Sequence, residues 1–156
     1  NANPDSMRAA IDVLAALPAP QLLVMGDMGE VGDQGPQFHA EAGAHARAAG
    51  IPSLWALGAQ SAHAVSAYAG GSGPGAGGTA RHFNDMHALQ QAVCEALPRL
   101  GSVLVKGSRF MKMEQVVEAM ASAVQAPGAS AHTPPPAAQE QQRNATAPEG
   151  HHGATP

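Results

Sequence analysis

The sequence predicts an α/β protein with a Rossmann-like, mainly parallel sheet flanked by helices. Two observations indicate this fold: short apolar runs alternate with segments of helical periodicity, and the 156 residues suffice for one ordinary domain. Strands that alternate with helices form parallel βαβ units, and near-continuous apolar strands are typical of a sheet covered on both faces.

The first helix is expected to begin after Asn3, because asparagine caps helices and Pro4 suits the first helical position. Apolar residues then recur at helical spacing: Met7, Ala10, Ile11, Leu14 and Leu17. Residues 21–25 form the first apolar run, which predicts a buried strand.

The middle of the chain repeats this alternation. A helix is expected from about Pro36 to Ala49, with Gly50 at its C′ position. Residues 53–57 predict the next strand, and Ser61 is expected to cap a short helix that ends near Ala69.

The remaining elements follow the same order. Residues 80–83 predict a third strand, and Asn84 or Asp85 is expected to start the next helix. Residues 102–105 predict a fourth strand. The last helix carries apolar residues on one face: Met113, Val116, Val117, Met120 and Val124.

Composition limits the classes of function. The formal net charge is -4 and 13% of residues are charged, which argues against a nucleic-acid partner. No apolar stretch approaches the ~20 residues that span a bilayer, and no signal peptide is recognisable, so we expect a cytoplasmic protein without membrane insertion. The single cysteine, Cys94, is expected to be a small core residue.

The domain is expected to occupy residues 1–124. Residues 125–156 contain no Val, Ile, Leu, Met or aromatic residue and six of the thirteen prolines. Such a segment cannot bury enough apolar surface to offset its conformational entropy, so we predict a disordered Pro/Ala/Gln-rich tail. The chain begins without methionine, and we expect it to be a piece of a longer protein.

Two loops are expected to carry ligand-binding residues, because ligands of open α/β sheets bind beyond the carboxyl ends of the strands. The first loop is acidic and contains Asp27 and Glu30; the second is basic and contains Lys106 and Arg109. The acidic side chains could orient an ammonium group or a metal-bound water, or they could be loop residues paired with the basic turn.

The basic turn also has two interpretations. It could be a solvated turn, but it joins a strand to a helix. In that place Gly107 allows close approach to a ligand, Ser108 can cap the helix, and Arg109 can clamp a carboxylate or phosphate. His39, near the start of its helix, is expected to be a partly buried structural residue rather than a base.

Nucleotide-binding fingerprints are weak in this chain. Residues 73–78 satisfy GxGxxG formally, but a helix precedes them and a strand follows, so a flexible loop is expected. No GxxxxGK[ST] sequence is present, so the chain lacks a P-loop.

Four motifs and one histidine, taken in order and spacing, resemble the C-terminal domain of the Mur ligases. They are NANPDSM (1–7), VMGDMGEVG (24–32), His39, LVKGSR (104–109) and MEQVV (113–117). The resemblance covers residues 1 to about 124.

The resemblance implies an ATP-dependent ligase that extends UDP-MurNAc-tripeptide with D-Ala-D-Ala in peptidoglycan precursor synthesis. ATP would phosphorylate the tripeptide carboxylate, and the dipeptide amine would attack the resulting acyl phosphate. The UDP-sugar domain and the central domain with the P-loop and Mg²⁺ site would lie outside this chain. We therefore expect the isolated chain to be inactive and to hold no catalytic residue or metal ligand.

Residue by residue, the resemblance implies two sets of contacts. ATP-binding positions match Asn1, Asn3 and Pro4, and substrate-binding positions match Asp27, Glu30, Lys106, Ser108 and Arg109. The basic turn would meet an anionic reactant, either the dipeptide carboxylate or developing phosphate charge. The alternative function is a stand-alone Rossmann-like binding module without catalysis.

Overall fold

Four parallel strands form a single sheet in the order β3-β2-β1-β4, which confirms the predicted Rossmann-like α/β class. The structure is a computed structural model and describes residues 2–71 and 78–125. Asn1, most of the glycine-rich loop and residues 126–156 of the predicted tail lie outside the described residues.

The observed elements follow the predicted order. Their bounds are α1 (Pro4–Ala15), β1 (Gln21–Gly26), α2 (Gly35–Ala48), β2 (Ser53–Leu57), α3 (Ala62–Gly70), β3 (Thr79–Phe83), α4 (Met86–Ala96), β4 (Ser102–Lys106) and α5 (Glu114–Gln125). Short 3-10 turns precede α2, follow α4 and precede α5: η1 (Gly32–Gln34), η2 (Leu97–Arg99) and η3 (Arg109–Met111).

Local signals in the sequence set several of these bounds. Asn3 caps α1 in a capping box: its Oδ1 accepts the Ser6 amide at 2.8 Å, and Ser6 Oγ accepts the Asn3 amide at 3.1 Å. Asp85 caps α4 by accepting the Ala88 amide at 2.8 Å. Gly50 follows α2 with a φ of 80°, as predicted.

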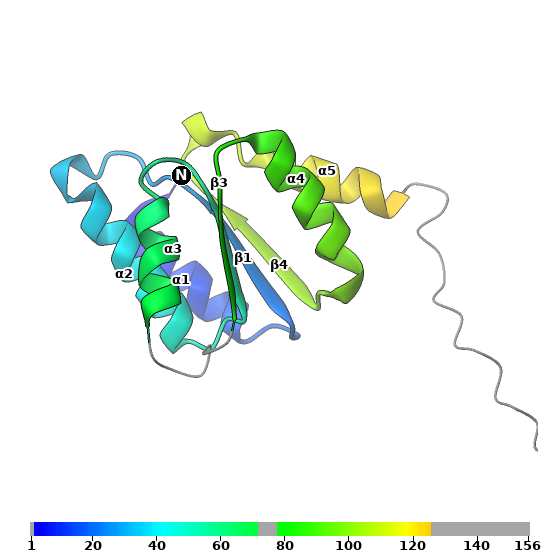
Figure 1. Ribbon diagram of the computed structural model, residues 1–156, viewed down its shortest axis with the longest axis horizontal. Helices are drawn as coiled ribbons and strands as arrows, with labels where there is room; N and C mark the ends of the chain where they lie inside the picture. The colour runs from blue at the N-terminus through cyan, green and yellow to red at the C-terminus, as the bar shows by residue number, and fades with distance from the viewer. Residues whose placement is uncertain (1, 72–77, 126–156) are drawn as a thin grey trace, which may run out of the picture.

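Helices cover both faces of the sheet and build two apolar clusters. The helices α1, α2 and α3 pack on one face, and α4 and α5 pack on the other (Figure 1). The central strand β1 is buried along its whole length, because both clusters press on it. Among the described residues, none of the helices has the length and apolar character needed to cross a membrane.

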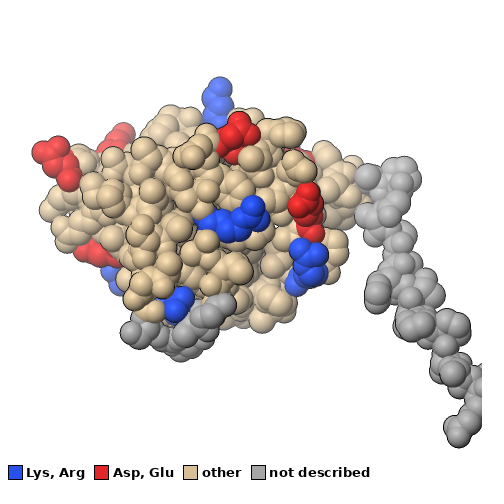
Figure 2. All heavy atoms as spheres, in the orientation of Figure 1, with Lys and Arg blue, Asp and Glu red and all other residues tan. Residues whose placement is uncertain are grey.

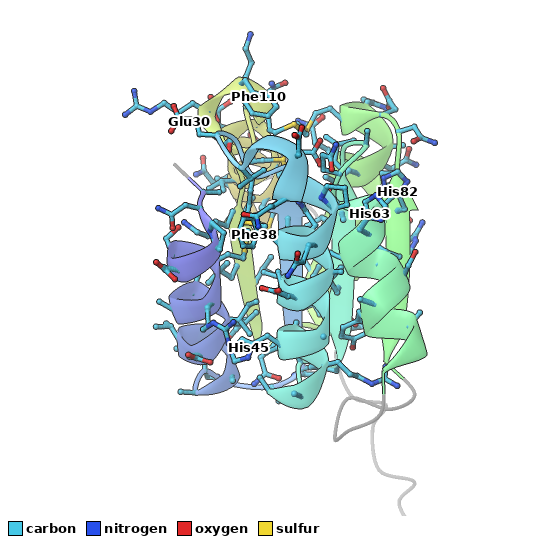
Figure 3. The ribbon with its side chains drawn as sticks, turned by 90° about the vertical axis from the view of Figure 1, so that its left-hand side faces the viewer. Glu30, Phe38, His45, His63, His82 and Phe110 are labelled. Carbon is cyan, nitrogen blue, oxygen red and sulfur yellow. The ribbon has the colours of Figure 1, made fainter. Side chains whose placement is uncertain are left out.

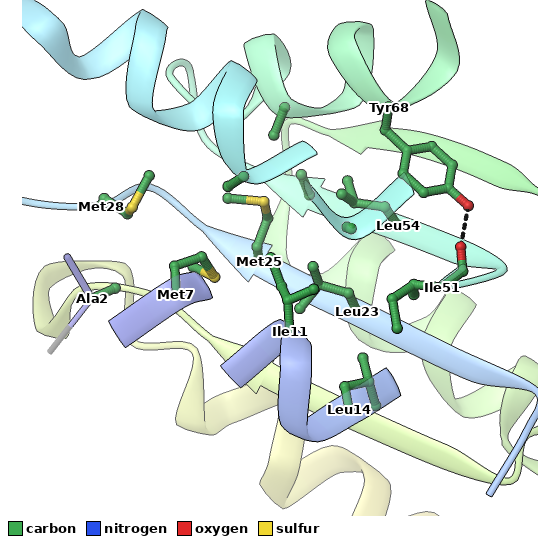
Figure 4. Packing of buried hydrophobic residues seen from close by; sticks show 14 residues of the cluster. Ala2, Met7, Ile11, Leu14, Leu23, Met25, Met28, Ile51, Leu54 and Tyr68 are labelled. Carbon is green, nitrogen blue, oxygen red and sulfur yellow. Dashed lines mark hydrogen bonds between the residues drawn. The ribbon is translucent and has the colours of Figure 1, made fainter. Parts of the chain in front are cut away.

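Tyr68 closes the first cluster beside β2. Its side chain is fully buried, and its hydroxyl donates to the Ile51 carbonyl at 2.6 Å (Figure 4). Burial raises the pKa of Tyr68 above its ordinary value of 10.0, while the nearby Arg47 guanidinium opposes that shift.

Tyr68→Phe should lower the free energy of unfolding by about 1–3 kcal/mol at neutral pH, because the buried Ile51 carbonyl loses its donor. The folded-state pKa of Tyr68 lies above the unfolded value, so its contribution to stability is present below pH 10.0 and is lost as the pH rises further. Urea unfolding at neutral pH and at about pH 11 should therefore show a smaller alkaline loss for Tyr68→Phe than for the wild type. An equal alkaline loss would contradict the assignment.

Candidate functional site

The loops after β1 and β4 leave neighbouring strands and diverge to opposite faces of the sheet. The loop after β1 leads to α2 on one face, and the loop after β4 leads to α5 on the other. This divergence is the topological switch point at which open α/β sheets bind ligands. The acidic and basic loops predicted from the sequence therefore lie side by side.

Ser108 joins the two loops directly. Its amide donates to the Asp27 carbonyl at 3.0 Å, and its Oγ accepts the Gly29 amide. Ser108 is buried. We expected Ser108 to cap the following helix, and this expectation is wrong, because η3 intervenes and α5 begins only at Glu114.

Gly29 has no side chain at the point where the loops meet. A Cβ added there would lie 2.9 Å from Ser108 Oγ and 3.2 Å from Cε1 of Phe110. A residue with a Cβ would force these side chains to shift, so glycine lets the loops approach this closely.

The Asp27 carboxylate faces the protein rather than the solvent. It accepts hydrogen bonds from the Ser61 amide at 2.8 Å, the Ser61 hydroxyl at 2.7 Å and the Gln60 amide at 3.2 Å. Asp27 therefore satisfies donors at the start of α3, the role expected for Ser61, whose own side chain makes no cap. Gly58 makes room for it, since a Cβ there would collide with the carboxylate.

His39 holds the next residue of the acidic loop. Its Nε2 lies 2.9 Å from the Met28 amide and accepts that proton, so Nδ1 carries the other proton and donates to the Gly35 carbonyl at 2.6 Å. The ring is completely buried. His39 is thus structural, as predicted, and more deeply buried than expected.

Glu30 and Lys112 have left-handed backbones, with φ of 57° and 49°. Among the described residues these are the non-glycine positions with positive φ, and they belong to the two loops at the switch point. Such backbones cost on the order of 1–3 kcal/mol and gather at functional sites. The exposed Glu30 and the ring of Phe110 project at this edge of the molecule (Figure 3).

Two hollows share the wall formed by Ser108 and Arg109. The first, of about 340 Å³, is also lined by Lys106 and Glu114. The second, of about 410 Å³, is lined by Gly29, Glu30 and Phe110 besides the shared pair. Arg109 is exposed and Lys106 is half-buried beside Met25 of the neighbouring strand.

Phe110 lines the second hollow, and the sequence analysis did not single it out. Helical and strand periodicity gave no sign of it, and its position directly after Arg109 in the basic turn was the available signal.

Asn3 and Pro4 lie at the same edge of the sheet. The connection from α1 to β1 is short, so α1 runs antiparallel to the strands and begins where they end (Figure 1). The amide oxygen of Asn3 is used in the capping box. Asn1, the third predicted nucleotide contact, is outside the described residues.

Two features would mark a metal or phosphate site in this chain. Residues 2–71 and 78–125 contain no group of three His, Cys, Asp or Glu side chains that could hold a metal ion, and the sequence has no P-loop. Charged side chains of both signs are scattered over a mostly uncharged surface on the face seen in Figure 2.

The sequence matches a known domain family and known enzymes. The family described as "Mur ligase, glutamate ligase domain" matches residues 1–109. The UDP-N-acetylmuramoyl-tripeptide--D-alanyl-D-alanine ligase of Escherichia coli is 41% identical over 122 residues, which cover 77% of this chain and 25% of the relative. The ligase of the same name from Bacillus subtilis is 33% identical over 120 residues, which cover 76% of this chain and 26% of the relative. The chain thus spans about a quarter of the length of these relatives.

Solved structures agree with these matches. MurF from Acinetobacter baumannii superposes with a TM-score of 0.63 at 30% identity, covering 78% of this chain and 26% of that one. A MurF ligase from Thermotoga maritima in complex with ADP superposes with a TM-score of 0.62 at 18% identity, covering 80% of this chain and 27% of that one. At this identity the likeness supports the fold alone.

Asp27→Ala should lower the free energy of unfolding by about 1–3 kcal/mol, because three donors at the start of α3 lose their acceptor. Asp33→Ala is the matched control, since Asp33 is an exposed carboxylate of the same loop and should change stability by less than about 0.5 kcal/mol. Chemical denaturation measures both. Equal stability of the two variants would show that Asp27 does not hold α3.

Proposed function

The chain belongs to the Mur ligase family, and from that premise we propose that residues 1–124 are the C-terminal domain of a ligase that joins D-Ala-D-Ala to UDP-MurNAc-tripeptide. The observation that carries the proposal is the joined pair of loops at the switch point. It puts a guanidinium and a carboxylate on one edge, which suits a reaction between an anionic acyl group and a zwitterionic dipeptide.

The proposed reaction forms one amide bond at the expense of ATP. ATP transfers its terminal phosphoryl group to the tripeptide carboxylate, which gives an acyl phosphate and ADP. The dipeptide amine attacks the acyl carbon, the carbon–oxygen bond to phosphate breaks, and the amine nitrogen releases a proton. The products are the pentapeptide and inorganic phosphate. We place this reaction in the cytoplasm, where ATP is supplied.

The machinery for phosphorylation is assigned to other parts of a longer protein. This assignment rests on the comparisons, because the chain spans about a quarter of the length of its ligase relatives. We propose that those parts hold the UDP-sugar, Mg²⁺ and most of ATP. The present domain would contribute Asn1, Asn3 and Pro4 to the nucleotide side when it closes over the site.

The domain's own contribution is binding and exclusion of water. Arg109 offers a planar fork of donors to a carboxylate or a phosphate, and Lys106 adds a second positive charge to the first hollow, which both residues line. Ser108 fixes the turn and Asp27 fixes the neighbouring loop, so both act as positioning residues. Glu30 supplies the negative charge that an ammonium group requires.

Arg109→Ala in the full-length protein should reduce kcat/KM for D-Ala-D-Ala by roughly thirty- to a thousand-fold, the effect of losing a charge-assisted pair worth ~2–4 kcal/mol in a closed cleft. Arg109→Lys should be nearly as damaging, because lysine lacks the planar fork. The melting temperature should stay unchanged, since Arg109 is exposed.

The matched control is Arg99→Ala, an exposed arginine in η2 before β4 and so at the opposite end of that strand. Its kinetics should equal those of the wild type. Wild-type kinetics in Arg109→Ala would reduce the basic turn to a solvated loop and remove the site assignment.

A further inference from the structure

Phe110 exposes its ring at the edge where the proposed substrate arrives. Its side chain is 65% exposed, and among the large apolar residues exposed in the described part of the chain it is the aromatic one. The others belong to α1, the segment just after it, or α5: Val13, Leu17, Val117 and Val124. Exposing a phenylalanine forgoes the free energy of burying its ring, which is a reason to look for a ligand.

Hydrogen bonds fix the backbone of the turn that carries Phe110. Ser108 before it is buried and bonded to both Asp27 and Gly29. The Met111 amide donates to the Ser108 carbonyl at 2.9 Å, and the Lys112 amide donates to the Arg109 carbonyl at 3.1 Å. The ring is therefore presented by a closed turn and lies close to Gly29, which has no side chain to displace it.

Three kinds of chemistry meet in the hollow beside this ring. Glu30 gives a carboxylate, Arg109 gives a guanidinium, and Phe110 gives an apolar wall, all around the bare backbone of Gly29. An apolar ligand would leave both charges unpaired, and a simple anion would leave Glu30 and Phe110 unused. A small zwitterion with apolar side groups matches all three.

We propose that Phe110 is a specificity-determining residue that packs against the methyl groups of D-Ala-D-Ala. Arg109 binds the carboxylate of the dipeptide and Glu30 orients its amine end. This inference rests on the proposed function and adds to it the side-chain class that the site selects. Glycylglycine carries the same charges without the methyl groups, so it should bind without benefit from Phe110.

The experiment compares D-Ala-D-Ala and glycylglycine as acceptors in the full-length protein, with kcat/KM measured from phosphate release. A missing methyl group in an apolar site is worth about ten-fold or more in kcat/KM. Phe110→Ala should therefore reduce the wild-type preference for D-Ala-D-Ala by about ten-fold or more, while the value for glycylglycine changes little. Phe110→Leu, which keeps an apolar wall, should retain most of the preference.

Val124→Ala is the control, because Val124 is a 70% exposed apolar residue near the far end of α5. The preference of this variant for D-Ala-D-Ala over glycylglycine should equal that of the wild type. Equal losses for both dipeptides in Phe110→Ala would show that the ring contacts another part of the protein, and would overturn the inference. An unchanged preference would overturn it as well. A wild-type protein that releases no phosphate with D-Ala-D-Ala would instead overturn the proposed function, and this inference with it.

Discussion

The hydrogen bonds of Ser108 are the constraint on which the ligand-facing edge depends. The strands β1 and β4 are adjacent, but their following loops turn to opposite faces of the sheet, so nothing in the strand pairing keeps the loops together. The Ser108 amide and hydroxyl bridge that divergence by bonding to Asp27 and Gly29. The edge is therefore a fixed surface formed by both loops.

Fixing the acidic loop requires several elements of the fold. Consecutive residues are held from different directions: Asp27 by the start of α3, Met28 by His39 of α2, and Gly29 by Ser108. Each hydrogen bond satisfies a polar group that would otherwise lie in the protein without a partner and lower the stability of the fold. The loop can then hold Glu30 in a left-handed backbone, because the surrounding bonds leave it little alternative.

The sequence predicted the elements well because their signals are local. Asn3 with Pro4, Gly50, Asp85 and the apolar runs each mark a bound through nearby residues, and the structure agrees to within about two residues. Ser61 stands at the N-cap position of α3 as predicted, but the side chains of Ser61 and Ser108 bond elsewhere, for the opposite reason. Both precede helical turns and look like caps, but the partners that decide their roles, Asp27 and Gly29, are distant in the sequence.

The site was predicted in outline for a similar reason. Parallel strands bring their carboxyl ends to one edge, so the sequence alone places the acidic and basic loops together. The orientation of each side chain could not be predicted, because it depends on contacts across that edge. Asp27 faces inward to α3, whereas Phe110, which no periodicity marks, faces outward.

The central claim is that the two loops bind one ligand as a unit, and a double-mutant cycle between Glu30 and Arg109 tests it most directly. These residues come from different loops and line the same hollow. The measurement is kcat/KM for D-Ala-D-Ala in the full-length protein with Glu30→Ala, Arg109→Ala and both changes. If one dipeptide spans both residues, the double variant should lose at least about five-fold less than the product of the single losses. A double variant whose loss equals the product of the two single losses to within about two-fold would contradict the account.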